Sequence, residues 1–144
     1  MDGHRKCEVC LRPSESMATD GNCPVCGKPL TLGVLHRVEA LADRPEGVRP
    51  ENRLPYQYII PLPEILSEIC QVGPKTKTVA TRYRAALEAL GPELEILLRR
   101  PLDEIRKAKI PLLDEAIRRM RVGEIHVSPG YDGEYGRITV FRPE

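Results

Sequence analysis

The chain has 144 residues, which leaves room for one ordinary domain or for a small metal-stapled unit joined to a helical one. With five Tyr, one Phe and no Trp, it lacks the aromatic side chains for a large base-stacking platform. No apolar run approaches the roughly 20 residues that cross a bilayer, and no secretion signal is evident, so we expect a cytoplasmic protein with reduced thiols and no membrane contact.

The net charge of +1 conceals an uneven distribution along the chain. Residues 1–73 hold 8 Lys and Arg against 10 Asp and Glu, residues 74–122 hold 12 against 7, and residues 123–144 hold 2 against 4. The middle segment is therefore the basic part of the chain. An excess of cations on helices is often only a solvated face, so the balance alone leaves both a soluble surface and an anion-binding surface open.

Four cysteines near the start of the chain have the spacing C-x2-C-x12-C-x2-C, namely Cys7, Cys10, Cys23 and Cys26. Each close pair can present two thiolates from one tight turn, and four sulfur ligands suit tetrahedral Zn²⁺ without an open position for a substrate. Gly27 favours a tight turn behind the second pair, where backbone N–H groups can point at the sulfurs, whereas the first pair lacks this glycine and should be looser. A disulfide pair and an iron–sulfur cluster are the alternatives. The spacing predicts a structural zinc site with only short hairpins around it.

A short helix and an irregular connection are expected next. Apolar residues recur every three positions from Leu32 to Leu41, which is typical of an amphipathic helix. From Arg44 to Pro63, five prolines exclude a long helix and predict an extended connection. Within it, residues 56–60 are a possible short strand or docking segment.

The following segment has apolar stripes with helical spacing, punctuated by prolines and glycines. The expected helices are 63–70, 75–90 with Gly91 as C-cap, one beginning at Pro92, and two that follow Pro101 and Pro111, the last ending near Gly123. After Glu124 the period changes to two on either side of a turn-rich stretch, which predicts a β-hairpin with a long ordered loop. The predicted fold is α+β in four parts: a four-cysteine zinc unit (1–31), a helix and Pro-rich connection (32–62), a helical region (63–123) and a C-terminal β-hairpin (124–144).

The turn between the first two helices of this region has the pattern of a helix-hairpin-helix, in which a turn and the start of the second helix meet a DNA phosphate. The candidate contacts are Val72, Gly73, Lys75, Thr76 and Lys77. Lysines in a first helical turn oppose the helix dipole, and they make sense if an anion lies in front of them. Gln71 replaces the usual first glycine, so a purely structural turn is the alternative.

No catalytic residues are evident. His4, His36 and His126 are scattered without metal-site spacing, there is no Gly-rich phosphate loop, and the acidic residues form no cluster of the kind a two-metal nuclease needs.

Three stretches together resemble the C-terminal portion of the endonuclease Q family: residues 23–44 (CPVCGKPLTLGVLHRVEALADR), 72–76 (VGPKT) and 130–136 (GYDGEYG). The resemblance implies a DNA-repair enzyme whose N-terminal PHP domain holds the catalytic metals and nicks DNA 5′ to deaminated bases or abasic sites. No position here corresponds to those catalytic residues, so the chain looks like a fragment. The implied partners are duplex DNA, including DNA with deaminated bases, and a PHP catalytic domain normally in cis.

On this resemblance, Tyr131 and Tyr135 in the hairpin loop could wedge beside an extruded base, and Asp132 could hydrogen-bond to it. The alternative is a Gly-rich loop whose tyrosines pack on the helices. Two other functional classes stay open. One is a zinc-stapled protein-interaction adaptor without nucleic-acid affinity of its own, and the other is an RNA-binding ribbon.

Overall fold

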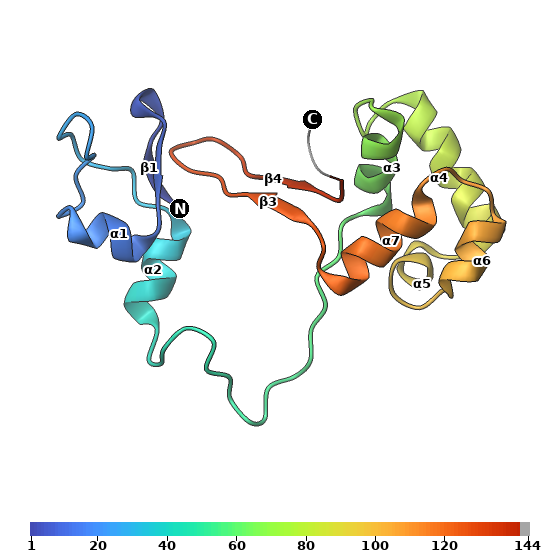
Figure 1. Cartoon of the computed structure of the whole chain (residues 1–144), viewed down its shortest axis with the longest axis horizontal. Helices are drawn as coiled ribbons and strands as arrows, with labels where there is room; N and C mark the ends of the chain where they lie inside the picture. The colour runs from blue at the N-terminus through green and yellow to red at the C-terminus, as the bar shows by residue number, and fades with distance from the viewer. Residues whose placement is uncertain (142–144) are drawn as a thin grey trace. The chain divides into compact units, whose positions relative to one another are not determined.

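The computed structural model describes residues 1–141. The α+β class predicted from the sequence is confirmed, since these residues form seven α-helices, one 3-10 turn and two separate two-stranded sheets (Figure 1). No helix within them is both long and apolar enough to cross a membrane.

The chain folds into two compact units. Of the described residues, the N-terminal unit comprises 1–55 and 128–137, and the helical unit comprises 56–127 and 138–141. The predicted segment 1–31 lies wholly in the first unit and 63–123 wholly in the second, while 32–62 and 124–144 contribute to both.

The N-terminal unit is built on a small antiparallel hairpin. Strand β1 (Asp2–His4) pairs with β2 (Val9–Leu11), and the 3-10 turn η1 (Arg5–Cys7) joins them. Two helices follow, α1 (Pro13–Ala18) and α2 (Val34–Leu41). The apolar core of this unit is small, because its buried members are Val9, Cys23 and Leu30.

Helix α1 corrects the expectation that residues 1–31 contain only short hairpins. Pro13 occupies the first helical position, where its fixed φ favours the helix, and the Glu15 carboxylate accepts the Arg12 backbone N–H at 2.6 Å. These end signals produce a helix of 6 residues, which is too short for an apolar period to reveal.

A buried carboxylate joins three elements of the N-terminal unit. Asp2 is fully buried on β1 and accepts hydrogen bonds from the Ser16 hydroxyl of α1 and, at 2.8 Å, from the backbone N–H of Gly33. His36 Nδ1 on α2 lies 2.7 Å from the same carboxylate. Burial raises the pKa of Asp2, but the bonds from Ser16, Gly33 and His36 outweigh burial and lower it. Asp2 is therefore a charged, fully paired group at the centre of this unit.

The helical unit follows the predicted helices closely. Its members are α3 (Leu62–Cys70), α4 (Lys77–Leu90), α5 (Glu93–Leu98), α6 (Leu102–Lys107) and α7 (Leu113–Val122). Prolines 61, 92 and 101 are the N-cap residues of α3, α5 and α6, which explains why the chain turns sharply at these points. Helix α3 packs on α4 and α7, and α6 packs on α7. The apolar stripes meet in one core, whose fully buried side chains include Leu62, Ile65, Leu66, Ile96, Leu97, Ile105, Leu113 and Ile117.

The predicted C-terminal hairpin is present as β3 (His126–Ser128) and β4 (Arg137–Thr139). Beyond β4, Glu68 of α3 accepts the backbone N–H groups of Val140 and Phe141 at 2.8 and 2.6 Å, which fixes this end of the hairpin in the helical unit.

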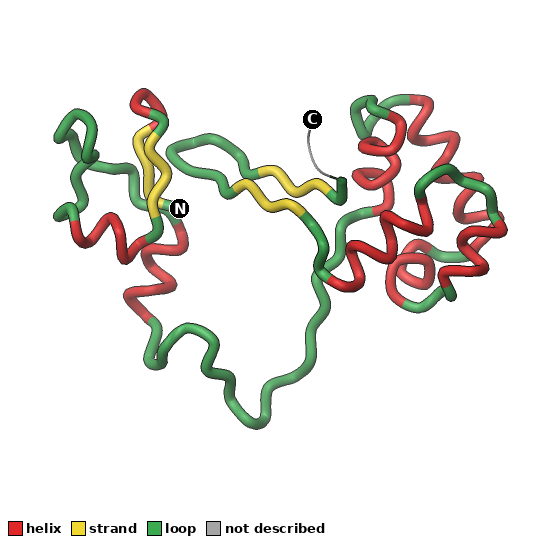
Figure 2. Tube along the Cα trace, viewed as in Figure 1, coloured by secondary structure: helices red, strands yellow, loops and turns green. Residues whose placement is uncertain are grey.

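Residues 56–60 form no strand, and Figure 2 shows neither helix nor strand between α2 and α3. Prolines 55 and 61 flank the segment, and the Ile60 N–H points at the Met120 sulfur of α7 at 3.2 Å instead of at a neighbouring strand. The segment docks on the helical core through the buried Ile60 side chain.

Candidate metal centre and nucleic-acid interface

Four metal-ligating side chains meet in the N-terminal unit: His4, Cys7, Cys23 and Cys26. Their ligand atoms all lie within 4.8 Å of one another. Cys10 is not a member of this group; it lies on β2, half-buried, opposite Gly3 of β1. Three of the four cysteines singled out in the sequence are thus brought together, and His4 stands where the spacing predicted Cys10.

Two similar turns present these ligands. His4 and Cys7 flank η1, and the next residue, Glu8, takes the left-handed conformation with φ 54°. Cys23 and Cys26 flank a turn closed by the Gly27 N–H to the Cys23 carbonyl at 2.8 Å, and Gly27 has φ 70°. Each ligand pair is therefore followed by a residue in the left-handed region, glycine in one turn and glutamate in the other.

The electrostatics of the thiols favour a bound cation. Burial alone would raise the pKa of Cys23, but backbone N–H groups of Cys26 and Val25 outweigh burial and lower that pKa to about 6. Burial, followed by hydrogen bonds to Cys26 and Cys23, raises the pKa of Cys7 to about 11. A divalent cation would relieve this crowding of thiolates.

The donor set suits zinc. Tetrahedral Zn²⁺ with Zn–S and Zn–N bonds of about 2.3 and about 2.0 Å places a sulfur and a nitrogen ligand about 3.5 Å apart, and Cys26 Sγ lies 3.4 Å from His4 Nδ1. Three cysteines and one histidine are a donor set that can complete the four-coordinate shell of Zn²⁺. The sequence contained a signal for His4, because His4-x2-Cys7 repeats the spacing of the C-x2-C pairs.

The second candidate site is the turn between α3 and α4, which holds five of the eight residues predicted to contact DNA, Val72, Gly73, Lys75, Thr76 and Lys77. Helix α3 ends at Gln71, which adopts the left-handed conformation with φ 53° and ψ 41°. The Val72 N–H bonds to the Ser67 carbonyl at 3.1 Å, and the Ser67 hydroxyl donates to the Val72 carbonyl at 2.6 Å. Gln71 therefore adopts the left-handed conformation that a glycine usually supplies at this position, and the turn closes although the glycine is absent.

Helix α4 begins with a side-chain cap. Thr76 is its N-cap, and its hydroxyl accepts the Val79 N–H at 3.4 Å. Lys75 and Lys77 flank this cap, and no acidic residue occupies the first turn of α4. Lys75 is exposed, as is Lys77. The helix start therefore presents backbone N–H groups beside two cations, as an anion site requires.

Substituting Gln71 by glycine is expected to raise the free energy of unfolding by about 1 kcal/mol, because glycine adopts the left-handed conformation without a Cβ penalty. Urea denaturation measures the change. The matched control is Ala80→Gly on the exposed side of α4, which should lower stability by about 1 kcal/mol. A loss of stability in both variants would contradict this explanation of the turn.

Ion pairs neutralise most cations of α5 to α7, but not those at the start of α4. Arg99, Arg100, Arg106, Lys107, Arg118 and Arg119 all lie within 4.0 Å of a carboxylate. Arg121 is occupied by three backbone carbonyls at 2.8 to 2.9 Å. Apart from Arg121, the cations of the basic segment that form no ion pair within residues 1–141 are Lys75, Lys77, Arg82, Arg84 and Lys109. The uncompensated positive charge therefore lies mainly on α4 and the turn before it.

The loop between β3 and β4 belongs to the N-terminal unit. Tyr131 packs against β1 so closely that a Cβ at Gly3 would collide with its ring. The Asp132 carboxylate accepts the Thr31 hydroxyl and the Arg5 backbone N–H, both at 2.6 Å, and these bonds lower its pKa. Tyr135, in contrast, is 98% exposed.

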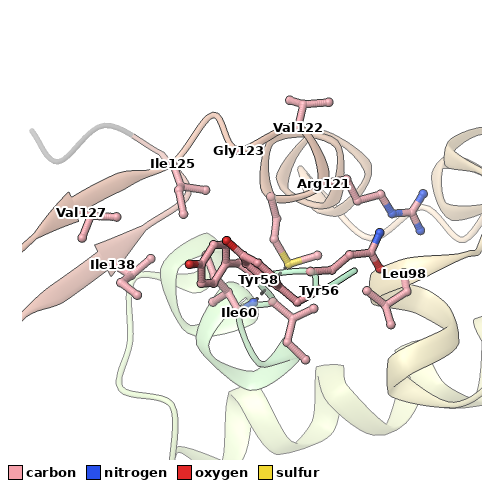
Figure 3. A pocket seen from close by; sticks show the side chains of 13 residues that line it. Tyr56, Tyr58, Ile60, Leu98, Arg121, Val122, Gly123, Ile125, Val127 and Ile138 are labelled. Carbon is pink, nitrogen blue, oxygen red and sulfur yellow. Dashed lines mark hydrogen bonds between the residues drawn. The ribbon is translucent and has the colours of Figure 1, made fainter. Parts of the chain in front are cut away.

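An apolar groove of about 670 Å³ lies within the helical unit (Figure 3). Tyr56, Tyr58 and Ile60 line it from the segment before α3, together with Ile125 and Val127. The rings of Tyr56 and Tyr58 meet edge to face, with centroids 5.2 Å apart. Tyr58, Val127 and Ile138 are 78%, 62% and 56% exposed, so the groove presents apolar surface to solvent.

Comparison with known proteins places this geometry in a family context. Residues 61–124 match the family described as the MJ0043 C-terminal domain. Over 96% of its length, the chain is 35% identical to the uncharacterized protein MJ0043 of Methanocaldococcus jannaschii. Over 92% it is 31% identical to the uncharacterized protein YqxK of Bacillus subtilis. These matches cover 17% of MJ0043 and 31% of YqxK, so the chain spans less than a third of either relative.

Two solved structures match at 27% identity. One is the lesion-specific endonuclease PfuEndoQ from Pyrococcus furiosus, with a TM-score of 0.80. The other is endonuclease Q in complex with a 27-mer duplex substrate with an abasic lesion at the active site, with a TM-score of 0.75. The resemblance to the C-terminal portion of endonuclease Q is confirmed. Each match covers 96% of this chain and 34% of the endonuclease Q chain, so the likeness extends over both the metal cluster and the helices.

Proposed function

We propose that this chain is the DNA-binding C-terminal region of an endonuclease Q-type repair enzyme. In this proposal it holds duplex DNA while a PHP catalytic domain, which corresponds to no residue here, nicks the strand 5′ to a deaminated base. One observation carries the proposal: Lys75 and Lys77 are exposed and form no ion pair within the described residues, at a helix start in a fold similar to an endonuclease solved with duplex DNA. The bound group would be a backbone phosphate, so the contact would not depend on sequence.

We also propose zinc as the resident metal, with His4, Cys7, Cys23 and Cys26 as its ligands. Its role is to hold the N-terminal unit folded. The closed donor set supports a structural role, since no position is left for a substrate or an activated water.

Reversing the two lysine charges tests the DNA-binding proposal. The double variant Lys75→Glu and Lys77→Glu is expected to bind an undamaged duplex about 10- to 100-fold more weakly, with a smaller salt dependence, because two phosphate contacts are lost. Fluorescence anisotropy at low salt measures the affinity.

The matched control is Arg99→Glu with Lys107→Glu, which changes the net charge by the same amount. These side chains are 78% and 77% exposed, and each is paired with a carboxylate. Their positive charge is therefore largely compensated and should attract an approaching phosphate only weakly. Equal weakening in both double variants would show a general charge effect and would count against the α3–α4 turn as the contact.

The apolar groove favours a second candidate, a protein-interaction adaptor without nucleic-acid affinity of its own. Exposed tyrosine and aliphatic side chains around a groove are typical of a protein-binding surface. The adaptor proposal predicts no binding of duplex DNA even at low salt, and no effect of the lysine reversals.

A further inference from the structure

Tyr135 is the most exposed of the large apolar side chains in the described residues, at 98%. An aromatic ring that lies wholly in water gains free energy when it is covered, so full exposure at a fixed position marks a contact surface. We propose that Tyr135 is a stacking side chain that enters the gap in a damaged duplex, beside a missing or unstacked base. This inference rests on the proposed function and names the feature of the DNA that the loop recognises.

The backbone of the loop is held rigidly. Tyr131 and Glu134 exchange backbone hydrogen bonds at 3.1 and 2.8 Å, and the residues between them, Asp132 and Gly133, have φ of 44° and 81°. Two positive φ values in succession are typical of a type I′ turn, which closes a hairpin tightly. Next to this turn, a Cβ at Gly136 would lie 2.7 Å from the Ser128 carbonyl, so the two sides of the loop touch through their backbones.

The other functional side chains of the loop are occupied within the N-terminal unit. Asp132 bonds to Thr31 and to the backbone of Arg5, and Tyr131 packs on Gly3. Arg5 follows the candidate metal ligand His4 directly, so the bonds of Asp132 fasten the loop to the turn between His4 and Cys7. Asp132 and Tyr131 therefore position the loop, and Tyr135 is the aromatic side chain that remains available for DNA.

The chemistry of Tyr135 fits a gap in the base stack. A ring stacks on any base, because every base has a π-face, so the contact needs no particular sequence. Glu134 is exposed and acidic, which makes the loop a poor ligand for phosphates and leaves the ring as its means of contact. An undamaged duplex offers no space for the ring, whereas an abasic site leaves the volume of one base open. The ring should therefore strengthen binding only to damaged DNA.

The test compares two duplexes of the same sequence, one undamaged and one with a single tetrahydrofuran abasic site, by fluorescence anisotropy with the full chain. The wild type is expected to bind the abasic duplex about 10-fold more tightly. Tyr135→Ala should remove this preference without changing the affinity for undamaged DNA, and Tyr135→Phe, which keeps the ring, should retain it. A 2-aminopurine beside the gap should be quenched by the wild type and by Tyr135→Phe but not by Tyr135→Ala.

Because Tyr135 is exposed, these substitutions should leave the thermal unfolding midpoint unchanged. A preference that persists in Tyr135→Ala, an equal loss on both duplexes, or a wild type that binds both duplexes alike would overturn the stacking role while leaving duplex binding in place. No binding of either duplex by the wild type at low salt would overturn the proposed function and the stacking role together.

Discussion

Removing the metal with a chelator should unfold the N-terminal unit and leave the helices of the helical unit formed. The N-terminal unit buries only Val9, Cys23 and Leu30 as its apolar core, and small units of this kind depend on a metal for their folding. Structural zinc contributes about 10 kcal/mol or more to the folding of small domains, which exceeds what this core can supply. Limited proteolysis with mass spectrometry should show new cleavages within residues 1–55, while most of the helical circular dichroism remains.

The ligand set can be tested by a matched pair of substitutions. His4→Ala is expected to weaken zinc binding by about 100-fold or more, because it removes one of four ligands. Cys10→Ala should leave the zinc content near that of the wild type, since Cys10 is not a member of the cluster. Zinc released on thiol modification, measured with a chromogenic chelator, gives both values. A loss of zinc in Cys10→Ala but not in His4→Ala would identify Cys10, and not His4, as the fourth ligand.

Asp2→Asn should lower the free energy of unfolding of the N-terminal unit by about 3 kcal/mol. The substitution keeps the size of the side chain but removes the charge that Ser16, Gly33 and His36 surround in a fully buried position. In asparagine, an NH2 group replaces one of the two carboxylate oxygens, and this group donates hydrogen bonds but cannot accept any of those made to Asp2. Urea denaturation of the zinc-loaded chain, followed by circular dichroism, measures the loss.

The control for this substitution is Asp43→Asn. The Asp43 side chain is 75% exposed and pairs with its neighbour Arg44, so loss of its charge should cost less than about 0.5 kcal/mol. Similar losses in the two variants would show that the network around Asp2 does not hold β1, α1 and α2 together.

The sequence was most informative where one residue pattern decides one element. The stripes of α3 and α4, the prolines that precede α5, α6 and α7, and the period-two pattern of the hairpin all predicted elements that the structure contains. These elements follow from local periodicity and end signals, which the chain carries within about ten residues. The turn after α3 also formed as expected, because Gln71 accepts the left-handed conformation that glycine usually supplies.

The sequence was less informative where a side chain finds its partner far along the chain. The Asp132 carboxylate accepts the backbone N–H of Arg5, 127 positions away, and the sequence around neither residue predicts this contact. The same holds for Asp2, a polar residue at the start of the chain that lies fully buried because Ser16, Gly33 and His36 converge on it. His4 was judged to lack metal-site spacing, whereas the fold brings it beside Cys7, Cys23 and Cys26.

The groove of the helical unit is a feature that the sequence could not predict, because it depends on how several segments pack together. Its lining comes from the segment before α3, from the end of α7 and from both strands of the hairpin, so it exists only after these parts pack. The sequence indicated a possible docking segment at residues 56–60, but it could not show that these residues leave a concave surface. This surface is where we expect a protein partner to bind if the adaptor proposal holds.

The most direct measurement is the salt dependence of duplex binding by the full chain, followed by fluorescence anisotropy on an undamaged duplex and on one with a single deoxyinosine. We expect binding to both that weakens about 10- to 100-fold between about 50 and about 200 mM salt, because a few phosphates are neutralised by lysines at the start of α4. Tighter binding to the deoxyinosine duplex would place lesion recognition within these 144 residues. No binding to either duplex at the lowest salt would contradict a DNA-binding role for this chain.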